Sequence, residues 1–247
     1  MPPPKHSESG KWLAIGILAM TVWLPTERAQ TQVITSSFAG AYSFEGQVNT
    51  LALAYNGAPI DNLQVGDLLK VGVASSATLD RFMASQWGSD FDAGKYFEFT
   101  LTAEVMPGIP FANFDLTSVE FALRRSSSGP RQFEWRSSTD NFAAPITTFG
   151  SLNAGIFEAG GRLTLPNLNS TQTYVGNTLL LSGPAYENQT SLTFRLYAYA
   201  SGSELGQGGL DSPLAFEGAM SIPEPSTWAL LLAGSAAFLL WGYRRRA

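Results

Sequence analysis

Four glutamates offer the catalytic chemistry that this sequence leaves most open. Glu98, Glu120, Glu134 and Glu217 each lie in a short stretch of alternating polar and apolar residues, on the side opposite the apolar ones. Two carboxylates roughly 5–9 Å apart across a cleft can hydrolyse a glycosidic bond. The same positions also suit a charged, solvated sheet face that keeps a protein soluble. We expect the solvated face, and therefore no enzymatic activity.

Composition removes most other catalytic groups. The 247 residues include no cysteine and a single histidine, His6. Disulfides, thiolate nucleophiles and zinc ribbons are therefore excluded. His6 lies in a leader that we expect to be removed, which leaves no imidazole for a triad or a metal. The net charge of −5 argues against a nucleic-acid partner, which requires a basic surface.

Asp90 and Asp92 have the spacing of oxygen ligands in a loop. Calcium takes six to eight oxygen ligands, so two aspartates make only part of a shell. Aspartate is also common in turns, because its side chain accepts hydrogen bonds from nearby backbone amides. The turn is the favoured interpretation. A structural calcium ion is the one cofactor that the sequence leaves open.

Aromatic side chains are the candidates for stacking on sugar rings. Tyr197 and Tyr199 alternate with Leu196 and Ala198, so they lie on the face opposite the apolar row. Trp135 is a third candidate glycan contact, but it shares a face with apolar neighbours, which favours burial in the core.

Four arginines are close together in the sequence: Arg124, Arg125, Arg131 and Arg136. Their guanidinium groups can bind the carboxylates of an acidic polysaccharide. They can equally pair with Glu120 and Glu134 across neighbouring strands. We favour this internal pairing.

The elements that position these residues are strands, because no segment keeps a 3.6-residue apolar period. Alternating runs rich in Phe, Val, Thr, Tyr and Leu are separated by Gly, Pro, Ser and Asn, which is typical of an all-β sandwich. The clearest runs cover residues 96–102, 118–124, 132–136, 162–165, 178–181, 192–199 and 214–220. Weaker strands are predicted near residues 44–55 and 68–74.

Both ends of the chain have the form of targeting segments. Lys5 and Lys11 precede an apolar run from Trp12 to Leu24, which predicts a secretory signal peptide over residues 1–29. Near the C-terminus, a second apolar run predicts a transmembrane helix over residues 228–243. The basic residues that follow it would stay in the cytoplasm by the positive-inside rule.

The C-terminal residues resemble the PEP-CTERM sorting signal of Gram-negative bacteria. Three parts occur in the order found in that family: a Pro-Glu-Pro triplet, an apolar helix and a terminal arginine cluster. The resemblance implies that exosortase, a membrane transpeptidase-like enzyme, recognises and removes the tail. It also implies a sorting signal made of Pro223, Glu224, Pro225, Arg244, Arg245 and Arg246.

Residues 79–200 are similar to the central domain found in many PEP-CTERM proteins. The similarity rests on an arginine- and serine-rich hairpin, residues 123–131, followed by an Arg-Ser-Ser turn, residues 136–142. That domain looks like a jelly-roll sandwich related to carbohydrate-binding modules. The sequence departs from the pattern at residues 210–213, where an Asp-Asn pair is missing.

We therefore expect one jelly-roll-like β-sandwich over residues 30–220, followed by a sorting tail over residues 221–247. The protein would cross the inner membrane, be anchored there transiently, and reach the cell surface or the extracellular matrix. The family suggests a non-catalytic structural or adhesive role in exopolysaccharide or biofilm. The alternatives are a glycan-binding module with a defined sugar site and a carboxylate-dependent polysaccharide hydrolase.

Overall fold

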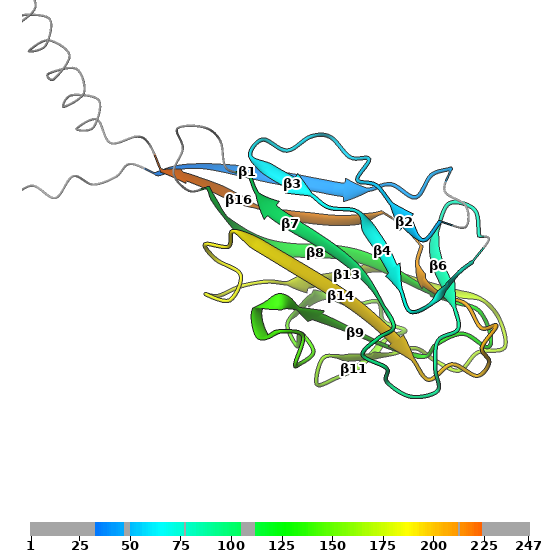
Figure 1. Ribbon diagram of the computed structural model, residues 1–247. Helices are drawn as coiled ribbons and strands as arrows, with labels where there is room; N and C mark the ends of the chain where they lie inside the picture. The colour runs from blue at the N-terminus through cyan, green and yellow to red at the C-terminus, as the bar shows by residue number, and fades with distance from the viewer. Residues whose placement is uncertain (1–32, 47–49, 77, 105–111, 212, 224–247) are drawn as a thin grey trace, which may run out of the picture. The chain divides into compact units, whose positions relative to one another are not determined.

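The computed structural model describes residues 33–46, 50–76, 78–104, 112–211 and 213–223 (Figure 1). These residues form two antiparallel β-sheets, and the helical structure among them is a single 3-10 turn, η1, at Ser138–Asp140. The predicted all-β sandwich is therefore confirmed. Within the described ranges, no helix is long and apolar enough to cross a membrane.

The first sheet follows the order β1-β16-β8-β15-β6-β5, with β13 on the other side of β8 and β10 next to β13. Its strands are β1 (Val33–Tyr42), β5 (Ala74–Ser75), β6 (Phe82–Ser85), β8 (Asn113–Arg125), β10 (Phe149–Ser151), β13 (Gln172–Leu180), β15 (Gly208–Leu210) and β16 (Leu214–Pro223).

The second sheet follows the order β11-β12-β9-β14-β7-β4-β2, with β3 also paired with β7. Its strands are β2 (Ala52–Leu53), β3 (Leu63–Val65), β4 (Leu68–Val71), β7 (Tyr96–Ala103), β9 (Gln132–Ser137), β11 (Phe157–Ala159), β12 (Arg162–Thr164) and β14 (Ser191–Tyr199).

The core lies between the two sheets and is rich in aromatic rings. Phe99 of β7 stacks on Phe216 of β16 with 6.3 Å between ring centroids, and Trp135 of β9 meets Phe121 of β8 edge-on at 5.4 Å. Strand β7 alternates strictly between buried and half-buried residues, as its sequence predicts. Burying rings of this size supplies much of the free energy that holds such sheets together.

Strand β1 is an element that the sequence did not predict in the N-terminal part of the domain. The weaker strand predicted near residues 44–55 is present as the two-residue β2, and the structure adds ten residues, Val33–Tyr42, alongside β16 without a register shift. The first and last strands of the described chain therefore lie side by side in one sheet (Figure 1). Strand β16 ends at Pro223, three residues beyond the predicted domain boundary at 220.

Candidate functional site

The outer face of the second sheet carries a layer of arginines and aromatic rings, which we call the arginine–aromatic layer. Its strands are β7, β9, β12 and β14, and the layer consists of Phe91, Tyr96, Glu98, Glu134, Arg136, Phe142, Arg162, Arg195, Tyr197 and Tyr199. Alternation along each strand places the strand residues of this layer opposite the apolar side chains of the core, whereas Phe91 and Phe142 come from loops. The layer contains two of the three predicted glycan contacts.

Glu134 is the centre of this layer. It is only 2% exposed and accepts hydrogen bonds from the Tyr199 hydroxyl, from Arg136 Nη2 at 2.9 Å and from Arg162 Nε at 3.3 Å. Burial alone would raise the pKa of Glu134, but the bonds from Tyr199, Arg136 and Arg162 outweigh it and hold the pKa below its ordinary value. Glu134 is therefore a structural anion and a poor proton donor near neutral pH.

A second ion pair lies beside the first. Arg195 Nε is 2.7 Å from Glu98 Oε2, and the two residues are direct cross-strand partners. The Arg195 guanidinium also lies 3.8 Å from the ring centroid of Phe142 and 4.2 Å from that of Tyr96. Phe142 closes the Arg-Ser-Ser turn with a left-handed backbone, φ 61°. The turn therefore covers Arg195 with an aromatic ring.

The three candidate glycan contacts are buried. Trp135 is 1% exposed in the core, and Tyr197 and Tyr199 are 2% and 5% exposed. Phe91 covers both tyrosines, with ring centroids 5.2 Å from Tyr197 and 5.7 Å from Tyr199, and Arg136 lies over the Phe91 ring. In this structure none of the three rings is open for stacking on a sugar, because a loop that the sequence left unplaced lies over the sheet.

That loop contains the candidate calcium ligands. Asp92 Oδ1 accepts a hydrogen bond from the Gly94 amide at 2.8 Å, and Asp90 Oδ2 accepts one from the Ser89 hydroxyl at 2.9 Å. The contacts of both carboxylates are those of a turn, and the same turn carries Phe91 onto the sheet. The described residues contain no group of three or more acidic or histidine side chains suited to a metal. Calcium binding by Asp90 and Asp92 remains an untested prediction.

The four arginines of the hairpin do not form one cluster. Arg136 pairs with Glu134 within strand β9, whereas the predicted cross-strand pairing of Glu134 is made by Arg162, and Arg124 pairs with Asp211 instead of Glu120. Arg125 is 1% exposed and donates to the carbonyls of Pro166, Ser127 and Gly129, which fixes the hairpin turn.

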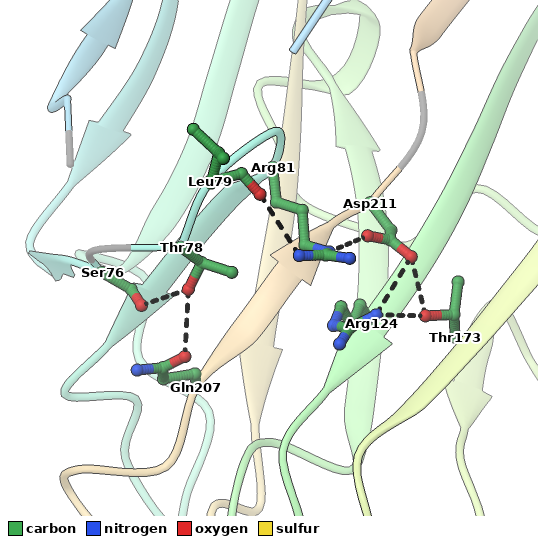
Figure 2. A network of polar contacts seen from close by, with 8 residues as sticks. All are labelled: Ser76, Thr78, Leu79, Arg81, Arg124, Thr173, Gln207 and Asp211. Carbon is green, nitrogen blue, oxygen red and sulfur yellow. Dashed lines mark hydrogen bonds and ion pairs between the residues drawn. The ribbon is translucent and has the colours of Figure 1, made fainter. Parts of the chain in front are cut away.

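Asp211 is the centre of a polar network that the sequence did not predict. It binds Arg81 Nε through Oδ1, and through Oδ2 it binds the Thr173 hydroxyl at 2.7 Å and Arg124 at 3.4 Å. Figure 2 shows these groups converging on one carboxylate, beside a smaller chain in which Thr78 connects Ser76 to Gln207. The network ties segments that are far apart in the sequence to the outer face of the first sheet.

The four glutamates considered for catalysis are divided between the two sheets. Glu98 and Glu134 are held by arginines in the arginine–aromatic layer. Glu120 and Glu217 are exposed on the outer face of the first sheet, where Ala215 pairs with Glu120 and Ser118 pairs with Glu217. They line a depression of about 230 Å³. Of these four glutamates, Glu120 and Glu217 therefore share one depression, and Glu98 and Glu134 are each bound by arginine.

A larger hollow lies between the loops that follow β6 and β14. Its volume is about 620 Å³, and its lining includes Gln86, Lys95 and Glu204. The loops are joined by backbone hydrogen bonds, among them Gln86 N to Glu204 O at 2.7 Å, and Lys95 Nζ donates to Gln86 O at 2.7 Å. A volume of this size can hold a small ligand, and polar linings suit hydroxylated ones. We call this hollow the loop cleft.

Comparisons with known proteins define the C-terminus. Residues 221–246 match the PEP-CTERM protein-sorting motif, which indicates an exported protein sorted by exosortase. The chain is thus a PEP-CTERM sorting domain-containing protein. Of the predicted signal, Pro223 is the last residue of β16. Glu224, Pro225, Arg244, Arg245 and Arg246 lie outside the described residues, as do the signal peptide and the transmembrane helix.

No curated protein matches the chain. Among solved structures, VP1 of Trichodysplasia spinulosa-associated polyomavirus is 11% identical over 77% of this chain and 94% of that chain, with a TM-score of 0.19. The unassembled KI polyomavirus VP1 pentamer is 9% identical over 78% of this chain and 94% of that chain, with a TM-score of 0.20. TM-scores this low support no conclusion about this chain.

Proposed function

We propose that this protein is a non-catalytic structural or adhesive component of an exopolysaccharide matrix, released to the cell surface after exosortase removes its tail. The observation that carries the proposal is the sorting motif at residues 221–246, whose first three residues are the last three residues of strand β16. We also propose that the sandwich is a jelly roll that resembles carbohydrate-binding modules.

The polar contacts of the sandwich support a structural role. Glu98, Glu134 and Asp211 all accept charge-assisted hydrogen bonds from arginines. A glycosidase needs one carboxyl group that donates a proton and another that acts as base or nucleophile across a cleft. Carboxylates engaged in this way are suited to holding strands together.

The proposal is tested in the exporting host by deleting the protein and measuring how much polysaccharide the washed matrix retains. We expect the deletion to lower retention and the wild-type chain to restore it. A chain with Arg244, Arg245 and Arg246 replaced by alanine should fail to restore it. Glu120→Gln and Glu217→Gln should restore it fully, and loss of complementation by either would instead favour the hydrolase.

The loop cleft favours glycan binding as the second candidate function. Its polar lining and its volume suit a short saccharide better than do the buried rings of Tyr197 and Tyr199. A glycan array probed with the purified full-length chain tests this function. Binding that Glu204→Gln removes and Glu104→Gln keeps would support the cleft, whereas binding unaffected by Glu204→Gln would rule it out.

A further inference from the structure

Strand β1 has one long backbone edge without a partner among the described residues. Its ten residues pair with β16 on one side only. The other strands that end the two sheets, β2, β5, β10 and β11, are two or three residues long. Short edge strands are one way in which proteins avoid unwanted pairing. Among the described residues, β1 is therefore the one terminal strand longer than three residues.

The sequence of β1 also lacks the usual protections. Its residues are Val-Ile-Thr-Ser-Ser-Phe-Ala-Gly-Ala-Tyr, with no charge and no proline. The pairing with β16 runs from Val33 with Pro223 to Tyr42 with Leu214 without a shift, so no bulge twists the edge away. Charged residues, prolines and bulges are what normally block an exposed edge. A neutral strand of this length without a bulge can accept another strand.

The free part of the edge is residues 33–39. Beyond it, Asn56 exchanges two hydrogen bonds of 2.8 Å with the backbone of Ser43. Gly57 lies so close to the strand that a Cβ atom added to it would be only 2.6 Å from the carbonyl oxygen of Ala41. The loop that contains Asn56 and Gly57 therefore covers the C-terminal end of the strand. The stretch that remains open has Ser36 at its centre.

We propose that a second copy of this chain pairs with β1 in antiparallel orientation, about a two-fold axis at Ser36. In this register Ile34 faces the partner's Phe38, and Thr35 faces the partner's Ser37. Ile34 lies in the core-facing row of β1 with Phe38 but is 50% exposed. Pairing removes part of this apolar surface from water. The proposal goes beyond the matrix role and does not depend on it.

The lack of charge on β1 lets a second copy pair at this edge. Each chain carries a net charge of −5, so two copies repel each other where acidic side chains meet. The ten residues of β1 carry no charge, so no like charges face each other in the paired ladder. A symmetric pair also satisfies the same backbone groups in both chains, as a closed dimer requires.

The first test uses the absence of cysteine from the sequence. Ser36→Cys places a single thiol at the proposed two-fold axis, where opposed Cα atoms lie about 4.5–5.5 Å apart, within reach of a disulfide. We expect the oxidised full-length chain, purified in detergent, to run as a dimer on a non-reducing gel. Ser151→Cys, exposed on the short edge strand β10, is the control and should remain monomeric. Equal cross-linking of both variants, or none, would overturn the proposal.

The second test addresses the register. Thr35→Lys with Ser37→Lys places like charges opposite each other twice and should weaken the dimer about tenfold in sedimentation measurements. Thr35→Lys with Ser37→Glu places opposite charges there and should restore it. A monomeric wild-type chain, or a dimer that the lysine pair leaves unchanged, would show that β1 does not bind a second copy.

Discussion

The Tyr199 hydroxyl on β14 donates a hydrogen bond to Glu134 on the neighbouring strand β9, and both side chains are buried on the outer face of their sheet. Burial and the adjacent carboxylate raise the pKa of Tyr199 to about 12. The phenol therefore stays protonated and donating over the whole physiological range. This pair fixes the part of the arginine–aromatic layer that lies under Phe91.

Glu134→Gln should reduce stability most clearly at neutral pH. The folded-state pKa of Glu134 lies below its ordinary value of 4.5, so its contribution is present above about pH 4.5 and is lost as the pH falls through the folded-state value. Removing the charge leaves Arg136 and Arg162 without their carboxylate, at a cost of about 1–3 kcal/mol. Thermal unfolding from pH 3 to pH 7 measures this. The difference in stability between wild type and variant should shrink toward pH 3. A difference that stays constant with pH would contradict the lowered pKa of Glu134.

Asp211→Ala should destabilise the first sheet by about 1–3 kcal/mol, because it leaves Arg81 and Arg124 facing each other without their shared anion. Denaturant unfolding followed by circular dichroism gives the value. Glu104→Ala, an exposed carboxylate, is the matched control and should change stability by less than about 0.5 kcal/mol. Equal effects of the two variants would mean that the network adds nothing to stability.

Lys70→Met should stabilise the protein at neutral pH. Lys70 is 8% exposed, donates to Ser75 Oγ at 3.0 Å and lies 4.2 Å from the Phe82 ring centroid. Burial lowers its pKa from 10.5 to about 8, so the folded protein binds fewer protons than the unfolded chain between these values.

Wild-type stability relative to Lys70→Met should therefore rise from pH 8 to pH 10, by about 1 kcal/mol after solvent screening is allowed for. Lys70→Arg keeps its charge throughout and should show no such rise. Chemical unfolding at several pH values measures the difference, and a flat profile for the wild type would show that the ammonium group is not buried.

Phe91→Ala should expose the two tyrosines beneath it. Phe91 is 38% exposed and forms aromatic contacts with both Tyr197 and Tyr199, so its loss should cost about 1–2 kcal/mol. Second-derivative absorbance reports tyrosine exposure and should shift toward the solvated value. Leu205→Ala, at a site that is 83% exposed, is the control and should leave the spectrum unchanged.

The alternation of apolar residues predicted most of the strands and their inward faces correctly. Phe97, Phe99 and Leu101 are buried as expected, and so are Phe194 and Leu196. Strand β1 was missed because its small residues weaken the pattern, and burial recurs only at Phe38 and Tyr42. A sheet edge needs fewer apolar residues than a central strand, so the local signal is weak there.

The sites were harder to predict because they depend on contacts between distant segments. Asp211 follows β15 in a stretch that looked like a break in a strand, and its partners Arg81 and Arg124 come from two other segments. Tyr197 and Tyr199 were assigned correctly to the outer face, but the sequence could not show that Phe91 covers them. Periodicity predicts the face of a residue and not what lies over that face.

The sorting of the chain by exosortase is tested most directly by the intact mass and both termini of the protein recovered from the cell surface and the medium. The comparison is between hosts with and without exosortase. The mature chain should end near Pro223 only when the enzyme is present. A chain that still extends through Arg246, unchanged in the two hosts, would contradict it and indicate a protein that stays anchored in the membrane.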